Sequence, residues 1–532
     1  MRIVQVLLVF VVVGGAHVAR ADSLAHVVTA AGVQPGQPIG PGGGAQKTPA
    51  PPAPADDLIT WAGQSKATTL PELLAVLIRQ SPALANAKLD IEIAEAQVQQ
   101  TYARGDWHLE GTAGVQRSQG GFFGGLEIDQ AINGQSSLDL FRQIPTGGTI
   151  TLHTSSQYNK TTYADPAIDA MFGSENWQHD VSATFNQPLL RGRGRWYYRA
   201  QERRAKLSRD AAVLARRAVA IQVVQTMIAT YWDLVLAQRQ VQITQGSLDL
   251  AKERLRITQI GADGGKIPRS EIPAVQQIIA TREEDVLNGQ LAVLDRSIEL
   301  RRNSGMTIGK GDLGLKVDTQ LAPGADALEL GAATERAFAA SPELAQLEKQ
   351  QQAATIEIEV TENGLLPQLD AALTAGPTGQ DDTFSGAWKN LAQFDTFTIG
   401  GQLTLQHNFG AENVRGLARQ QRAQRMKLKV NAADVRLQIA QTMARAVAQV
   451  ELAKRRVALS QRAIDLANEN IKIESDRFNL GKSTNFDVLN RQEELRQAEL
   501  RKAQAIVDWH KAEASVQALT GDILPTYGVS VE

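Results

Sequence analysis

Few residues of this 532-residue chain have the types and spacing that catalysis or metal binding requires. The seven histidines are scattered without metal-ligand spacing, and no cysteine is present to supply a thiolate or a disulfide. Gly264-Gly265-Lys266 is similar to part of a phosphate-binding loop, but Ile260 replaces the first glycine of that loop and Ile267 its Ser or Thr. No Gly-x-Ser-x-Gly nucleophile elbow occurs. We therefore expect no enzymatic activity, no cofactor and no bound metal.

Two glycine-containing turns hold the residues that remain of functional interest. They are Gly265-Lys266-Ile267-Pro268 and Gly481-Lys482-Ser483-Thr484. After the second turn, Thr484 and Asp487 form the T-x-x-D pattern of a capping box, in which the two side chains satisfy backbone groups at the start of a helix. Plain helix–helix turns would explain the glycines and capping alone would explain Asp487, so the turns do not by themselves indicate a partner.

Composition and the N-terminal residues indicate an exported protein. The net charge of −2 gives no indication of nucleic-acid binding. Residues 1–21 resemble a secretory signal peptide, with Arg2, an apolar segment at 3–15 and the cleavage pattern Ala19-Arg20-Ala21; an N-terminal core strand is the alternative. Residues 22–68, rich in Gly and Pro, are predicted to be a linker. No later segment is apolar enough for a membrane-spanning helix, so crossing a membrane would require a closed β-barrel.

An internal repeat organises the rest of the chain. Ser81-Pro82-Ala83-Leu84-Ala85 recurs as Ser341-Pro342-Glu343-Leu344-Ala345, an offset of 341 − 81 = 260. Asp249-Leu250-Ala251 recurs as Asp465-Leu466-Ala467, an offset of 465 − 249 = 216. The first copy therefore carries 260 − 216 = 44 extra residues ahead of residue 236. We place the first repeat at 69–320, the second at 321–521 and a C-terminal tail at 522–532.

Helical periodicity predicts a short helix, a strand region, a long helix and another short helix in each repeat. The predicted short helices cover residues 70–103 and 271–303, then 329–362 and 484–520. The long helices cover residues 197–260 and 411–479, about 95–105 Å at 1.5 Å per residue, against about 50–55 Å for the short ones. Two short helices placed end to end match one long helix, so all of them can line one tall coiled-coil-like wall.

Between the helices, apolar and polar residues alternate. The alternating segments are residues 107–115, 181–185, 369–375 and 396–406. Such alternation is typical of transmembrane barrel strands, and a half-buried soluble sheet is the alternative. The aromatic residues near the strand ends would form either a membrane-interface girdle or loop cores; they are Phe122, Phe123, Trp177, Trp388 and Phe394.

The 44 extra residues include a predicted hairpin. Its strands are residues 135–143 and 149–155, joined by the turn Pro145-Thr146-Gly147-Gly148. A chain that leaves and re-enters one compartment crosses a membrane an even number of times, so the first repeat would supply two or four crossing strands. The sequence leaves open whether the hairpin extends an outer loop or widens a barrel.

From residue 70 to residue 521 the pattern resembles the TolC-like outer membrane efflux protein family. The motifs that carry the resemblance are Ser81-Pro82, Ser341-Pro342, Gln187-Pro188-Leu189-Leu190-Arg191-Gly192, Tyr231-Trp232-Asp233-Leu234 and Gly481-Lys482-Ser483-Thr484-Asn485-Phe486-Asp487-Val488-Leu489. The resemblance implies a mainly α-helical fold with a β-barrel: a tandem-duplicated unit that forms a trimeric transmembrane β-barrel continued by a long periplasmic α-helical barrel. Each chain of the family gives four strands, which implies a barrel of twelve, or more if the added hairpin crosses. The second repeat departs from the pattern, because Gln406-His407-Asn408-Phe409 lacks the proline that redirects the strand into the helix.

The resemblance also implies a function. It implies a homotrimeric outer-membrane channel with its helical tunnel in the periplasm, conducting substrates passively in a tripartite efflux pump or a type I secretion system. The implied partners are outer-membrane lipid, a periplasmic adaptor (membrane fusion) protein docked on the two turns and, through it, an inner-membrane pump. A periplasmic coiled-coil scaffold or adaptor with a soluble β-domain is the alternative.

A periplasmic constriction is the last implication of the resemblance. The family places rings of acidic residues there, one carboxylate per chain. Asp487 falls at one ring position, where three carboxylates would raise one another's pKa and favour cations. Asn490 falls at a second ring position and is neutral. Family members that lock the entrance carry Tyr and Arg near the positions of Phe478 and Ser483, so closure in this chain would rest on other contacts.

Overall fold

Two very long helices run through the structure, a computed structural model that describes residues 68–265, 267–308, 313–318, 321–322 and 329–530. The predicted signal peptide, the linker up to residue 67 and Lys266 lie outside the described residues. The long helices are α6 (Ala200–Asp263, 64 residues) and α11 (Glu412–Asn479, 68 residues). Their shorter partners after the turns are α7 (Glu271–Ser304) and α12 (Asn485–Thr520). These ranges confirm the helix predictions to within a few residues.

The short helices that precede the strands are each divided in two, which corrects the prediction of single helices at 70–103 and 329–362. The pieces are α2 (Leu70–Gln80) and α3 (Pro82–Tyr102), then α8 (Leu330–Ala340) and α9 (Pro342–Asn363). The break falls at Ser81 and at Ser341, whose ψ angles of 118° and 113° are extended. Proline disfavours the helical conformation in the residue before it, which explains both breaks.

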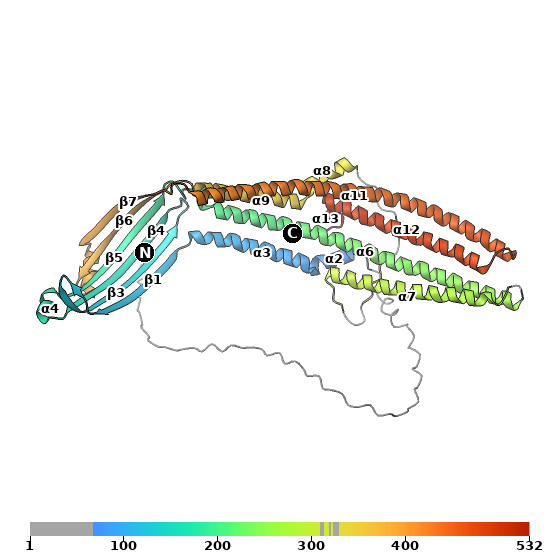
Figure 1. Cartoon of the computed structure of the whole chain (residues 1–532), viewed down its shortest axis with the longest axis horizontal. Helices are drawn as coiled ribbons and strands as arrows, with labels where there is room; N and C mark the ends of the chain where they lie inside the picture. Colours follow the sequence, from blue (N-terminus) through green and yellow to red (C-terminus); the bar gives the residue numbers. More distant parts are fainter. Residues whose placement is uncertain (1–67, 266, 309–312, 319–320, 323–328, 531–532) are drawn as a thin grey trace, which may run out of the picture. The chain divides into compact units, whose positions relative to one another are not determined.

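Six long strands form one antiparallel sheet in the order β1-β3-β4-β5-β6-β7 (Figure 1). Their bounds are β1 (His108–Gln119), β3 (Leu126–Gln143), β4 (Thr149–Tyr163), β5 (Ser174–Pro188), β6 (Gln368–Asp381) and β7 (Thr396–Gln406). The first repeat therefore supplies four of these strands and the second repeat two. The shorter elements are η1 (Ala103–Gly105), β2 (Phe122–Phe123), α4 (Pro166–Phe172), α5 (Arg195–Tyr198), α10 (Phe384–Gln393) and α13 (Ile523–Thr526).

The two ends of the sheet differ in their connections. The chain passes between helices and sheet at residues 103–107, 189–199, 364–367 and 407–411, all at one end of the strands. We call this the helix-linked end. The connections at the opposite end contain β2, α4 and α10. The turn at 144–148, between β3 and β4, lies at the helix-linked end although it leads into no helix.

The hydrophobic core runs along the helices and repeats with the sequence. In the first repeat Leu73, Leu77, Met227, Leu234 and Leu300 are almost fully buried in one cluster. In the second repeat a corresponding cluster contains Ala337, Val435, Met443, Val450 and Trp509. The packing of equivalent elements in both halves confirms the tandem duplication.

Helix α6 also corrects one sequence inference. It contains an 18-residue window whose length and composition would suit a membrane-spanning helix, although no such segment was expected. Half of that window is buried inside the protein, and α6 packs along α3, α7, α9 and α12. The core helix of a soluble domain has the same properties, so this window is weak evidence for a membrane span.

Candidate functional site

One face of the sheet is polar over its whole width. Residues paired across an antiparallel sheet point to the same face, so the register assigns each side chain to a face. The register places these polar residues together: Glu110, Thr112, Gln135, Ser137, Asp139, His153, Ser155, Gln157, Asp180, Ser182, Thr184, Asp370, Thr374, Thr378, Gln402 and Thr404. Four of them are acidic, and no lysine or arginine falls on this face along the described strands. This polar face would favour cations if it lined a water-filled space.

Hydrogen bonds join neighbouring strands across the polar face. His153 Nδ1 lies 2.7 Å from Asp139 Oδ1, which links β4 to β3. Thr378 Oγ1 donates to Asp180 Oδ1 at 2.9 Å, and Thr184 and Thr374 share a hydroxyl–hydroxyl bond of 2.9 Å. These bonds satisfy polar side chains within the sheet and leave the face hydrophilic.

The other face carries an apolar band, with polar and charged residues such as Arg117, Arg142, Lys160 and Glu175 toward the ends of the strands. It carries Leu109, Ala113, Val115, Leu138, Leu140, Ile150, Leu152, Val181, Phe185, Ala371, Leu373, Ile399, Leu403 and Leu405. Its side chains are largely exposed in the single chain; Val115 is 81% exposed and Leu403 71%. An exposed apolar band on strands of this length is the pattern of a sheet that faces lipid.

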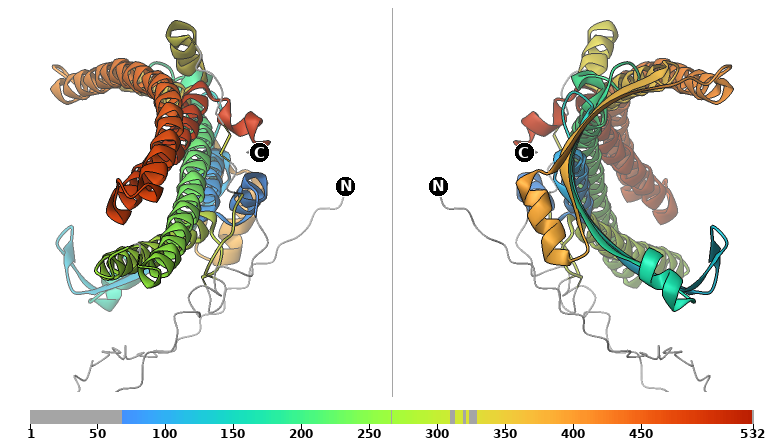
Figure 2. Two further views of the ribbon diagram at one scale, coloured as in Figure 1. Left: turned by 90° about the vertical axis from the view of Figure 1, so that its right-hand side faces the viewer. Right: turned by 90° about the vertical axis from the view of Figure 1, so that its left-hand side faces the viewer.

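Aromatic residues gather on the apolar face near the end remote from the helices. The ring of Trp177 lies 5.0 Å from Phe384 in a T-shaped contact, and Trp388 stacks on the buried His179 at 4.7 Å. Figure 2 shows α10, which carries two of these rings, against the convex side of the curved sheet. Trp177 and Trp388 both pack around His179 in one cluster, an arrangement that fits a membrane-interface girdle and a loop core alike. Phe394 pairs with Phe397 at 6.1 Å, Phe122 is exposed, and the side chain of Phe123 lies outside the described residues.

The turn before α12 holds the predicted constriction residues. Asp487 Oδ2 accepts hydrogen bonds from Thr484 N at 3.0 Å, from Thr484 Oγ1 at 2.7 Å and from Ser483 Oγ at 3.2 Å. The bond from the Thr484 backbone N–H and those from the two hydroxyls hold the pKa of the Asp487 carboxyl below its usual value. Asp487 therefore caps α12, as the sequence predicted, and it remains exposed together with Asn490.

Phe478 and Ser483 are engaged within the chain. The guanidinium of Arg254, on α6, lies 5.0 Å from the centre of the Phe478 ring, and burial lowers the pKa of Arg254. Ser483 Oγ lies 2.5 Å from Glu474 Oε1 and 3.2 Å from Asp487 Oδ2, so its single hydroxyl hydrogen is shared between two carboxylates. The first contact joins the two long helices close to their turns.

Sequence reasoning missed a second contact between the two helical hairpins. Asn485 Nδ2 donates to Glu271 Oε2 at 2.5 Å, and Asn485 is only 2% exposed. The repeat offset would have found Glu271, because 487 − 216 = 271 makes it the counterpart of Asp487. The contact itself joins residues 214 apart in the sequence and no local pattern predicts it.

The turn between α6 and α7 presents part of the predicted docking tip. Gly265 adopts φ = +69° and Gly481 adopts φ = +70°, so both turns require a left-handed residue. Gly265 and Pro268 are exposed, whereas Ile267 is half-buried and folds back over Gly261. Lys266 belongs to the residues that the structure does not describe.

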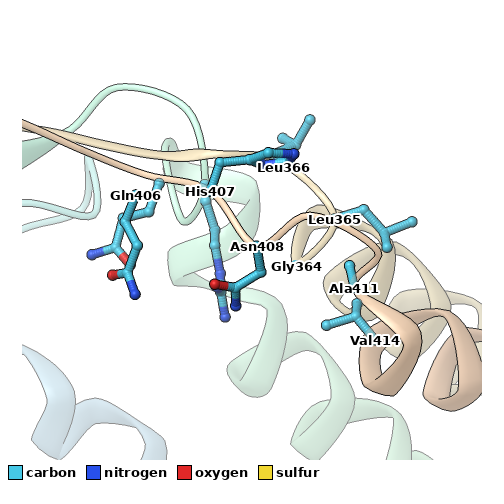
Figure 3. Close-up of a pocket in the computed structure, with 10 residues that line it drawn as sticks. Gly364, Leu365, Leu366, Gln406, His407, Asn408, Ala411 and Val414 are labelled. Atoms are coloured by element: carbon cyan, nitrogen blue, oxygen red, sulfur yellow. The ribbon is translucent and has the colours of Figure 1, made fainter.

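The junction between β7 and α11 redirects the chain without the proline of the first repeat. Gly410 at φ = +93° and Ala411 at φ = +45° make the bend instead. A cavity of about 100 Å³ lies here between the two strand–helix connections of the second repeat (Figure 3). Its lining residues are Arg191, Gly364, Leu365, Leu366, Gln368, Gln406, His407, Asn408, Ala411 and Val414. Within the described ranges, no group of three or more His, Asp or Glu side chains lies close enough together to hold a metal ion.

A two-faced sheet continued by helical hairpins of this length defines a class of protein: a membrane-embedded β-barrel with a long helical extension. The sequence profile of one family, described as outer membrane efflux protein, matches residues 73–306 and 333–522. The chain belongs to this family. It is accordingly an outer-membrane protein with a periplasmic helical tunnel and functions as an efflux channel; members of the family are trimeric channels that work with efflux pumps.

Solved structures of outer-membrane channels share this fold. The CmeC outer membrane channel of Campylobacter jejuni is 13% identical, with a TM-score of 0.62, and the match covers 85% of each chain. VceC of Vibrio cholerae is 13% identical with a TM-score of 0.62, covering 85% of this chain and 96% of VceC. The channel OprN is 14% identical with a TM-score of 0.64, covering 90% and 98%. No curated protein sequence gives a significant match.

Proposed function

We propose that three copies of this chain form the exit duct of a tripartite assembly, either an efflux pump or a type I secretion system. The duct conducts cargo passively from the periplasm to the exterior, and the chain catalyses no reaction. The two-faced sheet carries this proposal. Its edge strands β1 and β7 are exposed along their whole length and each lacks a partner on one side within the described chain. Pairing each β7 with the β1 of another copy gives hydrogen-bond partners to the backbone N–H and C=O groups along both edges. Lipid cannot supply such partners.

The two helical turns form the docking tip for a periplasmic adaptor, which connects the duct to an inner-membrane pump. Exposed apolar side chains beside the turns support this assignment: Ile260 is 60% exposed, Leu480 71% and Phe486 64%. Solvent-exposed apolar residues clustered at a turn are typical of a protein-binding surface. The residues of the turns themselves are Gly265, Lys266, Ile267, Pro268, Gly481, Lys482, Ser483 and Thr484.

Asp487 and Asn490 face the threefold axis in this proposal and form the periplasmic constriction. Both side chains are exposed in the single chain, so they can point toward the axis of a trimer. Phe478 and Ser483 hold the turn beside the constriction in place, because Phe478 contacts Arg254 and Ser483 contacts Glu474 of the same chain. One carboxylate from each of three copies gives the entrance a preference for cations.

A soluble periplasmic scaffold is the competing function. The exposed apolar face weighs against it, because a soluble sheet covers such a face with other elements.

Fractionation of cells that express the full chain separates the two functions. We expect the protein in the outer-membrane fraction, as trimers that migrate as such on gels until heated. Recovery of the chain as a soluble periplasmic monomer would overturn the duct and favour the scaffold.

A further inference from the structure

The added hairpin β3–β4 lies in the middle of the sheet and is not an appendage of an outer loop. β3 pairs with β1 from His108–Phe141 to Gln119–Gln130. β4 pairs with β5 from Thr149–Asn186 to Thr161–Ser174. Without the hairpin, β1 and β5 would be neighbours in the sheet. The hairpin therefore separates two strands that would otherwise pair with each other.

The hairpin continues both faces of the sheet. Leu138 and Leu140 of β3 and Leu152 of β4 lie on the apolar face beside Leu109 and Ala183. Ser137 and His153 of the hairpin lie on the polar face, with Thr112 and Ser182 as their partners in β1 and β5. A hairpin that projected into water would not need an apolar band in register with that of its neighbours.

The turn of the hairpin is held at the helix-linked end. Thr146 O accepts hydrogen bonds from Gly194 N at 2.8 Å and from Gln187 Nε2 at 3.1 Å, and Thr146 Oγ1 donates to Gln187 Oε1 at 2.7 Å. Gly147 adopts φ = +92°, and a Cβ there would collide with the carbonyl oxygen of Gly192. β3 and β4 therefore run the full distance between the two ends of the sheet.

Both added strands are long enough to cross a membrane. β3 has 18 residues and β4 has 15. A tilted transmembrane strand requires only about 9–11 residues.

We infer that each chain contributes six membrane-crossing strands, so that the trimer closes a barrel of 3 × 6 = 18 strands rather than twelve. This inference rests on the proposed trimer. β1 leaves the helix-linked end and β7 returns to it, so β7 of one copy meets β1 of the next in the antiparallel sense used throughout the sheet. The partner of each edge strand is thus a second copy of this chain.

An eighteen-stranded wall changes what the channel admits at its outer end. Barrel diameter grows roughly linearly with strand number, so the ratio 18/12 makes the lumen about half again as wide. The hairpin also brings Asp139 and His153 to the polar face. Each repeat supplies a divided helix before its strands, one long helix after them and one helix after the turn, so the widening belongs to the barrel alone.

Single-cysteine labelling tests the inference, because the natural chain has no cysteine. Ser137→Cys and Leu138→Cys are adjacent on β3 and point to opposite faces. In proteoliposomes we expect a charged, water-soluble maleimide to label Ser137→Cys roughly tenfold faster than Leu138→Cys, whose thiol faces lipid. Similar labelling of both variants would place the hairpin in water and overturn the inference.

Leu403→Cys and Thr404→Cys on β7 are the matched controls, since β7 belongs to the barrel wall with either strand number. They should show the same contrast. If the β7 pair shows the contrast and the β3 pair does not, the trimeric channel stands and the eighteen-stranded barrel fails. If neither pair shows it, the membrane barrel itself fails.

Counting strands by electron cryo-microscopy provides a second measurement. The intact trimer should show eighteen strands in its wall, and twelve would overturn the inference. A variant that lacks residues 120–163, a deletion of 163 − 120 + 1 = 44 residues, joins β1 to the loop before β5. We expect its trimers to have twelve strands. The count on the intact protein decides the question even if the deletion variant does not fold.

Discussion

At the scale of single residues, Asp487 shows how one carboxylate can serve both the fold and the proposed function. Its hydrogen bonds to Thr484 and Ser483 cap α12 and lower its pKa, so its charge persists at pH values where an ordinary aspartate begins to protonate. Three such carboxylates around an axis would raise one another's pKa. The capping bonds oppose that effect and favour a ring that stays ionised near neutral pH.

Replacing Asp487 should weaken the cation preference of the channel. Asp487→Asn removes the charge but retains an oxygen that can accept the Thr484 N–H, whereas Asp487→Ala also removes the cap. We expect both variants to lower the cation-to-anion permeability ratio in planar bilayers and only the alanine variant to loosen the first turn of α12. Some preference should remain, because acidic residues such as Asp180 also lie on the polar face of the sheet.

The pH dependence gives a further check on the same ring. Because the capping bonds hold the pKa of Asp487 low, the wild-type cation preference should persist at neutral pH and be lost as falling pH protonates the ring. Unchanged selectivity in Asp487→Asn would remove Asp487 from the conducting axis and leave it as a cap.

At the scale of elements, the glycines that end α7 and α12 are equivalent in the two repeats. Gly305 has φ = +79° and Gly521 has φ = +76°, and both cap a helix in the left-handed conformation. A Cβ on Gly305 would meet the carbonyl oxygen of Gln80, and one on Gly521 would lie 2.9 Å from the Cβ of Ala340. Gln80 and Ala340 are related by the offset 340 − 80 = 260, and Gly305 and Gly521 by the offset 521 − 305 = 216. The same glycine contact therefore occurs in both repeats.

Alanine at either glycine should destabilise its repeat. The left-handed conformation alone costs about 1–2 kcal/mol for a residue with a side chain, and the contact with the Gln80 backbone makes Gly305→Ala the more severe change. Thermal loss of helical circular dichroism of the purified trimer would measure this. The control is Gly246→Ala in the exposed middle of α6, where nothing lies within 4 Å of the added methyl group and stability should hold or rise. Equal melting of all three variants would contradict the proposed role of the caps.

The sequence predicts elements better than it predicts contacts. Periodicity and the repeat offsets predict the four helices after the strands, because these features are local and duplicated. The breaks at Ser81 and Ser341 could have been predicted from the proline that follows each serine. The position of β3–β4 within the sheet could not, since pairing with β1 and β5 depends on backbone partners distant in the chain. The bond between Asn485 and Glu271 could not be predicted either, because its two residues are also distant in the chain.

At the scale of the whole molecule, the two faces of the sheet determine how the chain meets its surroundings. The apolar face needs lipid and the polar face needs water, and only a closed wall supplies both. The single chain therefore exposes surfaces that the assembled channel divides between membrane and lumen.

A charge on the apolar face should prevent assembly in the membrane. Lysine on the lipid face of a barrel costs up to about 4 kcal/mol at the bilayer midplane, so Leu403→Lys should reduce the yield of outer-membrane trimers. Gln402→Lys, the neighbouring position on the polar face, is the matched control and should assemble normally. Equal yields of both variants would mean that this face does not contact lipid.

The turn at 144–148 has a consequence for engineering. It is bonded to the strand–helix connection of β5 and carries no helix of its own, so a hairpin can be added to or removed from the wall without a matching change in the tunnel. The diameter of the barrel can then change in steps of one hairpin per subunit. Grafting or deleting such hairpins at this site would give nanopores that differ in barrel diameter and share the same helical tunnel.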